Sequence, residues 1–128
     1  MFEEIIRAIA LKRKKLNRDA ALGAVGVLVA IYQYDGFAHS YDVRLLDQSV
    51  KTIAENADLT EDDLLGLYRD IATKQNEIAL CLYQWVKMAR EEECLTILLL
   101  KITRLIGKDT SGYTLRELSV LDTLSKIL

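Results

Sequence analysis

Two pairs of acidic residues are the side chains in this sequence best suited to chemistry. Asp35 and Asp42 are seven residues apart, and Gly36 lets the chain reverse between them. Their carboxylates can then converge on one divalent cation, because hard cations take oxygen ligands. A purely structural alternative stays open, since Gly36 can end one helix and Asp42 can complement the dipole of the next.

Asp109 and Glu117 hold the same places in a second copy of this pattern. Each half consists of an apolar segment, a turn that contains Gly and Asp, and an amphipathic segment opened by a carboxylate. The apolar segments are residues 20–34 and 94–106. This repetition predicts an internal helix-turn-helix duplication, in which Asp109 and Glu117 form a similar but looser pair. The spacing does not match a calcium-binding EF-hand loop.

The histidine and the cysteines give weaker indications of chemistry. His39 is the only histidine, and it lacks the Glu three residues earlier that marks di-metal helical bundles. No Ser or Cys is placed by the sequence to act with it as a nucleophile. Cys81 and Cys94 lie within apolar helical stretches, which predicts two buried, reduced thiols. The sequence therefore predicts no catalytic residue and no cofactor other than a divalent cation.

Composition places the chain among compact, charged-surface domains. Its 128 residues predict a single domain over 1–128, and the net charge of −2 argues against nucleic acid as the main partner. The first residues, Met1-Phe2-Glu3-Glu4, are acidic where a signal peptide would be basic. The longest uncharged run, 20–34, would span about 22 Å as a helix, less than the bilayer core of about 30 Å. We therefore expect a cytoplasmic protein without a transmembrane segment.

The elements that must position these residues are all expected to be helical. No proline interrupts the chain, and no run alternates between apolar and polar residues as a strand would. About seven helices are expected. Two should cover residues 2–16 and 18–34, a third should begin near 40, and a fourth should begin after Thr60. A fifth should cover 76–88, a sixth should include Glu91–Glu93 in its first turn, and a seventh should follow Thr114.

Gly23 and Gly26 lie one turn apart in the second expected helix. Each costs about 1 kcal/mol in helix propensity, so we expect a neighbouring helix backbone to pass close to both. The apolar character of the whole segment predicts a helix that is buried on all sides. Thr60 with Asp63, and Thr114 with Glu117, have the spacing of capping boxes at helix starts.

Two surface features suggest partners. The basic run Lys12–Lys15 can contact an anionic membrane or an acidic protein, although cations at a helix C-terminus are also stabilising by themselves. Aromatic residues can anchor a protein partner or a homodimer contact, and they can equally belong to the core. The aromatic candidates are Tyr32, Tyr34, Tyr41 and Trp85.

The stretch from Val29 to Asp42, Val-Ala-Ile-Tyr-Gln-Tyr-Asp-Gly-Phe-Ala-His-Ser-Tyr-Asp, resembles the TerB-like family. That family includes tellurite-resistance TerB and the amino-terminal domain of a membrane-bound DnaJ-type co-chaperone. Its signature is an apolar helix ending in Ala-x-x-Asp-Gly, followed by an acid seven residues after the Asp. Asp42 stands where the family usually has Glu. Asp109 and Glu117 take the corresponding roles in a degenerate second copy, which has one extra loop residue.

The resemblance covers roughly Arg18 to Leu128 and implies an all-helical, seven-helix domain with an internal duplication. It also implies a bacterial cytoplasmic protein with an acidic, metal-interacting patch and without a well-established catalytic activity. The leading hypothesis is a non-enzymatic interaction or stress-response module that docks a protein partner. A membrane-peripheral, co-chaperone-type adaptor or scaffold is the alternative. An enzyme that uses His39 and the paired acids is the least favoured hypothesis.

Overall fold

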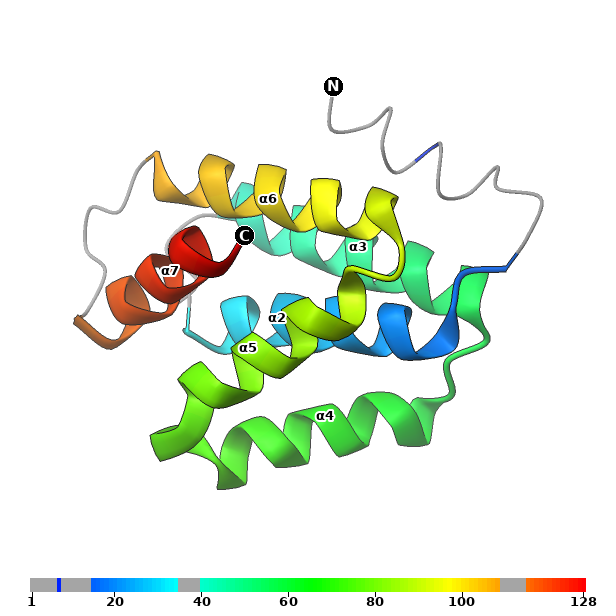
Figure 1. The fold of residues 1–128 in the computed structure, drawn as a ribbon, viewed down its shortest axis with the longest axis horizontal. Coiled ribbons are helices and arrows are strands. Elements are labelled where there is room, and N and C mark those ends of the chain that lie inside the picture. The colour runs from blue at the N-terminus through cyan, green and yellow to red at the C-terminus, as the bar shows by residue number, and fades with distance from the viewer. Residues whose placement is uncertain (1–6, 8–14, 35–39, 109–114) are drawn as a thin grey trace.

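The computed structural model describes residues 7, 15–34, 40–108 and 115–128 (Figure 1). All regular structure within these ranges is helical, which confirms the all-α prediction. The helices are α2 (Arg18–Tyr34), α3 (Ser40–Ala57), α4 (Glu61–Thr73), the short 3-10 helix η1 (Gln75–Glu77), α5 (Ile78–Ala89), α6 (Glu93–Gly107) and α7 (Leu115–Ile127). The expected helix over 2–16 falls mostly outside the described residues, and its last two residues, Lys15 and Leu16, are not helical.

Helix α2 lies at the centre of the domain. It packs against α3, α4, α5, α6 and α7, and its most extensive contact is with α5. Figure 1 shows α2 running between α5 and the α3–α6 layer, with α4 along the bottom of the view. A helix at the surface of a protein buries only one apolar stripe against the core. Helix α2, in contrast, is buried around most of its circumference. The fully or almost fully buried positions are Ala20, Ala21, Ala24, Val25, Val27, Leu28, Val29, Ala30 and Ile31. The predicted all-round burial of this helix is confirmed.

The two glycines of α2 make room for α5. A Cβ atom on Gly23 would lie 2.4 Å from the carbonyl oxygen of Trp85 and 2.7 Å from the Cβ of Met88. The predicted approach of a neighbouring helix backbone is confirmed at this position. At Gly26 the expectation was wrong in detail, because the neighbour there is the Trp85 indole ring, 2.6 Å from the position of a Cβ. Trp85 therefore fills the groove that the missing side chain leaves.

Helices α3 and α4 are joined by two well-defined caps. Thr60 Oγ1 accepts a hydrogen bond from Asp63 N at 3.1 Å, and Asp63 Oδ2 accepts one from Thr60 N at 2.8 Å, so the predicted capping box is confirmed. At the end of α3, Asp58 has a positive φ of 53°, and Leu59 N donates to Ala54 O at 3.2 Å. That is a Schellman end with Asp where Gly is usual.

Two other helix starts differ from the expected ones. The chain from residue 76 first forms η1, so α5 begins at Ile78. Helix α6 begins at Glu93, and Glu91 and Glu92 precede it rather than occupying its first turn. The Glu92 carboxylate instead accepts a hydrogen bond from Asn17 N at 3.0 Å. Helix α7 begins at Leu115, directly after Thr114, which lies outside the described residues together with the predicted Thr114–Glu117 capping bonds.

The N-terminus of α2 is held by the ends of its neighbours. Asn17 Oδ1 caps α2 by accepting from Ala20 N at 3.0 Å. Leu16 N donates to Asn56 O at 2.9 Å, which ties this end to α3. Lys15 pairs with Asp58, and Arg18 donates to Asp63 Oδ1 at 2.5 Å. The start of α2 is therefore joined to α3, to α4 and to the α5–α6 connection.

Asp63→Asn is expected to lower the melting temperature at pH 7 and to have no effect at strongly acidic pH. Hydrogen bonds from the Thr60 backbone and side chain, with Arg18 alongside, lower the pKa of Asp63 below its ordinary value of 3.8. A carboxylate with a lowered pKa stabilises the fold above its ordinary pKa, and that contribution disappears as the pH falls through the lowered value. Melting curves from pH 7 to pH 2 measure the difference.

The matched control for this prediction is Asp62→Asn. Asp62 is a neighbouring acid in the first turn of α4 and makes none of the capping bonds described above, so it should lower the melting temperature less. Equal losses for Asp62→Asn and Asp63→Asn at pH 7 would show that helix charge, rather than the cap, accounts for the effect.

Candidate functional site

The structure places the backbone of two of the four predicted cation ligands. Asp42 lies in the first turn of α3 and Glu117 in the first turn of α7, as expected. The side chains of both, and Asp35 and Asp109 as a whole, lie outside the described residues, as does His39. Within the ranges that the structure describes, no group of three or more His, Cys, Asp or Glu side chains is arranged to hold a metal ion.

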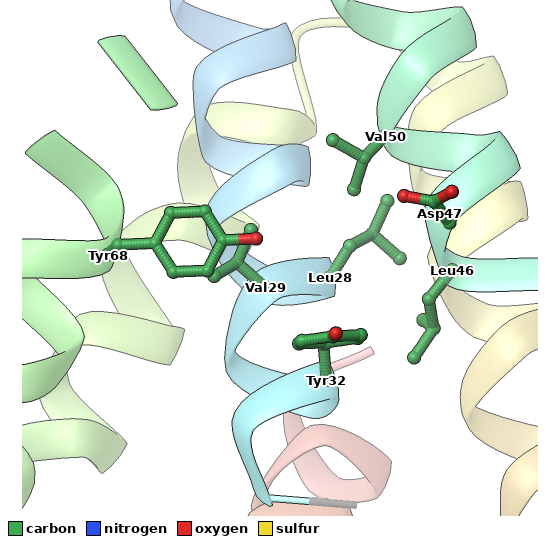
Figure 2. Close-up of a pocket in the computed structure, with 7 residues that line it drawn as sticks. All are labelled: Leu28, Val29, Tyr32, Leu46, Asp47, Val50 and Tyr68. Carbon is green, nitrogen blue, oxygen red and sulfur yellow. The ribbon is translucent and has the colours of Figure 1, made fainter. Parts of the chain in front are cut away.

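A pocket lies between α2, α3 and α4 (Figure 2). Its cavity volume is about 80 Å³. That is well below the roughly 300–1,000 Å³ of pockets for drug-sized ligands. Helix α2 contributes Leu28, Val29 and Tyr32, α3 contributes Leu46, Asp47 and Val50, and α4 contributes Tyr68.

Helical spacing explains why these side chains meet. Leu28 and Tyr32 are four residues apart on α2, and Leu46 and Val50 are four apart on α3, so each pair lies on one helix face. On α4 the buried residues are Leu67 and Ile71, and Tyr68 is next to that face. Figure 2 shows the Tyr68 ring reaching from α4 toward α2, so that its hydroxyl group lies near Val29.

The pocket has an apolar floor and a polar rim. Leu28, Val29 and Leu46 are buried, whereas Asp47 is exposed and Tyr68 is 41% exposed. Figure 2 shows the Asp47 carboxylate on the α3 side and the Tyr32 ring, seen edge-on, below Leu28. Because the aliphatic floor is almost inaccessible, a ligand in this pocket would contact mainly the two tyrosine rings, the Asp47 carboxylate and the half-buried Val50.

The three polar groups of the rim are close enough to influence one another. The pKa of Tyr68 is raised, first by burial and then by repulsion from an ionised Tyr32 and from Asp47. Tyr68 therefore keeps its hydroxyl proton and remains a hydrogen-bond donor well above neutral pH. Among the described residues, Asp47 takes part in no ion pair, although Arg44 and Lys51 lie three and four positions away on α3. The Asp47 carboxylate is therefore available to a ligand at the pocket mouth.

Sequence reasoning identified only part of this pocket. Tyr32 was named as an aromatic anchor, whereas Asp47 and Tyr68 were not connected with it. Of the other aromatic candidates, Trp85 belongs to the core, because it is 8% exposed and packs on Gly26. The side chains of Tyr34 and Tyr41 lie outside the described residues. The one feature of the sequence that could have indicated the pocket is Asp47, a charged residue next to the apolar pair Leu46 and Val50.

The cysteines and the basic run can now be placed. Neither Cys81 nor Cys94 is in a disulfide, and both are half-buried, so the expectation of buried thiols was wrong. Burial raises the pKa of Cys81 and favours the neutral, unreactive thiol. Of the run Lys12–Lys15, only Lys15 belongs to the described residues, and it pairs with Asp58.

Comparisons with protein-family models, with curated proteins and with solved structures found no match. Within the described ranges, every helix is too short or too polar to cross a membrane.

Proposed function

We propose that this chain is a non-enzymatic interaction module of the TerB-like kind. In this proposal a divalent cation is held by Asp35 and Asp42, with Asp109 and Glu117 as a weaker second pair. The observation that supports it is the arrangement of α2 and α3. They pack against each other, the connection between them contains Asp35-Gly36, and α3 begins at Ser40, so Asp42 belongs to its first turn.

The second half of the chain supports the duplication that this proposal includes. Helices α6 and α7 also pack against each other, and Glu117 belongs to the first turn of α7, as Asp42 does in α3. Asp109 lies between α6 and α7, as Asp35 lies between α2 and α3. The repeated order is an apolar helix, an acidic connection and a helix opened by an acid.

A role in binding rather than catalysis is supported by the chemistry of the pocket. Its polar groups are two phenols and one carboxylate, and none is a nucleophile with an adjacent general base. Exposed apolar side chains on α4 and α5 support a protein partner, since such residues often mark interaction surfaces. Leu65 is 52% exposed on α4, and Leu80 and Tyr83 are 69% and 60% exposed on α5. We place this module in the bacterial cytoplasm, in a stress-response role.

The cation site is tested by melting the protein with and without Ca²⁺ or Mg²⁺. A ligand that binds only the folded state raises the melting temperature by mass action, so either ion at millimolar concentration should raise it. Asp35→Asn should remove most of that rise and should cost little stability without the ion, because two neighbouring carboxylates repel each other.

The matched control is Glu55→Gln, which removes an exposed acid near the other end of α3, about 20 Å along the helix from Asp42. This variant should keep the full response to the ion. If neither ion changes the melting temperature of the unmodified chain, or if Asp35→Asn and Glu55→Gln respond alike, the cation proposal is wrong.

A further inference from the structure

The rim of the pocket between α2, α3 and α4 carries one carboxylate and two tyrosine rings. Asp47 is exposed, lies outside the buried face of α3 and caps no helix. Tyr68 places a large ring on the rim with two-fifths of its surface accessible to solvent. Tyr32 is half-buried beside them. A carboxylate and two aromatic rings thus surround one small opening.

Aromatic rings and a carboxylate favour the same kind of ligand. The face of a tyrosine ring attracts a cation through its quadrupole, and a carboxylate attracts it by its charge. Figure 2 shows the Tyr32 ring edge-on, so one of its faces is turned toward the side occupied by Leu28. The Asp47 carboxylate lies across from Tyr68 on the opposite wall. A positive group between the three would meet aromatic surface and negative charge together.

The apolar floor narrows the choice of cation. A hard metal ion requires several oxygen ligands, whereas the pocket offers one carboxylate and two phenols above Leu28, Leu46 and Val50. An organic cation with a short aliphatic chain fits this combination, because its methylene groups can contact Val50 and the tyrosine rings while its charge stays beside Asp47. A cavity of about 80 Å³ accommodates the end of a single side chain or a small amine rather than a drug-sized molecule.

We propose that this pocket binds an alkylammonium group, with its aliphatic chain against Val50 and the Tyr68 ring and its charge between Tyr32, Asp47 and Tyr68. The group is a lysine side chain of a protein partner or a free primary amine, and both present the same chemistry. The proposal rests on the interaction function above and adds to it the chemical class of what is bound. Arg44 and Lys51, the two cations nearest to Asp47 along α3, leave it unpaired among the described residues.

The experiment is a titration of the full chain, labelled with ¹⁵N, with n-butylammonium chloride at constant ionic strength and with EDTA present. The amide signals of Val29, Tyr32, Asp47, Val50 and Tyr68 should shift together and give one dissociation constant. n-Butanol, which has the same chain without the charge, should bind at least threefold more weakly. Asp47→Asn should raise the dissociation constant for n-butylammonium about three- to fivefold, the effect of one partly exposed charge contact.

Two further variants separate the carboxylate from general charge and the ring from its hydroxyl group. Glu55→Gln removes an equal charge from the same helix and should leave the dissociation constant unchanged. Tyr68→Phe keeps the ring and should retain most of the binding, whereas Tyr68→Leu should weaken it about as much as Asp47→Asn. Both positions are exposed enough for the variants to fold, which melting curves verify.

A final pair of probes identifies the source of the ammonium group. Nα-acetyl-lysine methylamide that binds as tightly as n-butylammonium assigns the pocket to a lysine side chain. Binding of n-butylammonium alone assigns it to a free amine. Equal binding of n-butylammonium and n-butanol, or an unchanged dissociation constant in Asp47→Asn, overturns the proposal. Because EDTA is present, this result is independent of the divalent-cation test on Asp35, and either test can fail without the other.

Discussion

Replacing Gly23 with Ala is expected to destabilise the protein by about 1–3 kcal/mol, the usual cost of overpacking a core. Helix propensity alone predicts the opposite sign, since Ala is favoured over Gly by about 1 kcal/mol inside a helix. The packing effect should win because the new methyl group would lie 2.4 Å from the Trp85 carbonyl oxygen and 3.2 Å from Ala89 N. Both are backbone atoms of α5, so that helix must move away from α2. Urea unfolding followed by circular dichroism measures the change.

Gly66→Ala is the matched control for this prediction. Gly66 is also inside a helix, α4, but no atom lies within 4 Å of the position where its Cβ would stand. Here only helix propensity acts, and the free energy of unfolding should rise by about 0.5–1 kcal/mol. If both glycine substitutions stabilise the protein, α2 and α5 do not approach each other as closely as described.

Trp85→Ala is expected to have the largest effect of any single substitution, a loss of about 3–5 kcal/mol. The indole is buried in the core and lies directly against Gly26 of α2. Removing it leaves a cavity in the most extensive helix contact of the fold, and the rigid helix backbones cannot close around it. The same unfolding measurement applies, and Tyr83→Ala on the exposed side of α5 should stay within about 0.5 kcal/mol of the unmodified protein.

A double-mutant cycle with Gly26→Ala tests the contact itself. The new methyl group would lie 2.6 Å from the Trp85 ring, so Gly26→Ala should be destabilising when Trp85 is present. In the Trp85→Ala background the methyl group has room, and Gly26→Ala should be neutral or stabilising. Additive effects would mean that the two residues do not share this space in solution.

The centre of the fold could be predicted from the sequence because it depends on one local property. A segment without charges that is too short for a membrane must be covered by other helices, and α2 is covered in this way. Gly23 and Gly26 predicted a close helix contact in the same way. Two glycines lower the helix propensity of this segment, and close packing of a neighbouring helix can offset that loss. Neither observation named α5 as the partner, because periodicity contains no information on which helices meet.

The details at helix ends depended on contacts between distant residues and could not be predicted. Asp58 adopts a positive φ, a conformation usually marked by glycine. Glu92 looked like a first-turn acid of α6, yet its carboxylate binds the backbone of Asn17. The Glu92 contact depends on where the start of α2 lies relative to the α5–α6 connection, and the Asp58 helix end is unusual because its residue is not glycine. The two contacts have no counterpart in the local sequence pattern.

The pocket was predictable only in part for a related reason. Tyr32 and Val50 lie on the two helices that flank the acidic connection, so their proximity follows from a helix pair. Tyr68 comes from α4, and its place on the rim depends on how α4 packs on α2. A tyrosine beside an apolar helix face looks the same in a sequence whether it covers the core or borders a binding site.

The central position of α2 also has a consequence while the protein is being synthesised, because the helices that cover α2 are made after it. It is the first of the described helices to leave the ribosome, yet its principal partner α5 begins at Ile78 and α6 ends only at Gly107. At about 5–20 residues per second, the segment from Ala20 to Ile31 is without its cover for seconds in every newly made chain. During that interval it is the natural target of a chaperone that binds apolar segments, and a chain released before α5 is complete would expose it permanently.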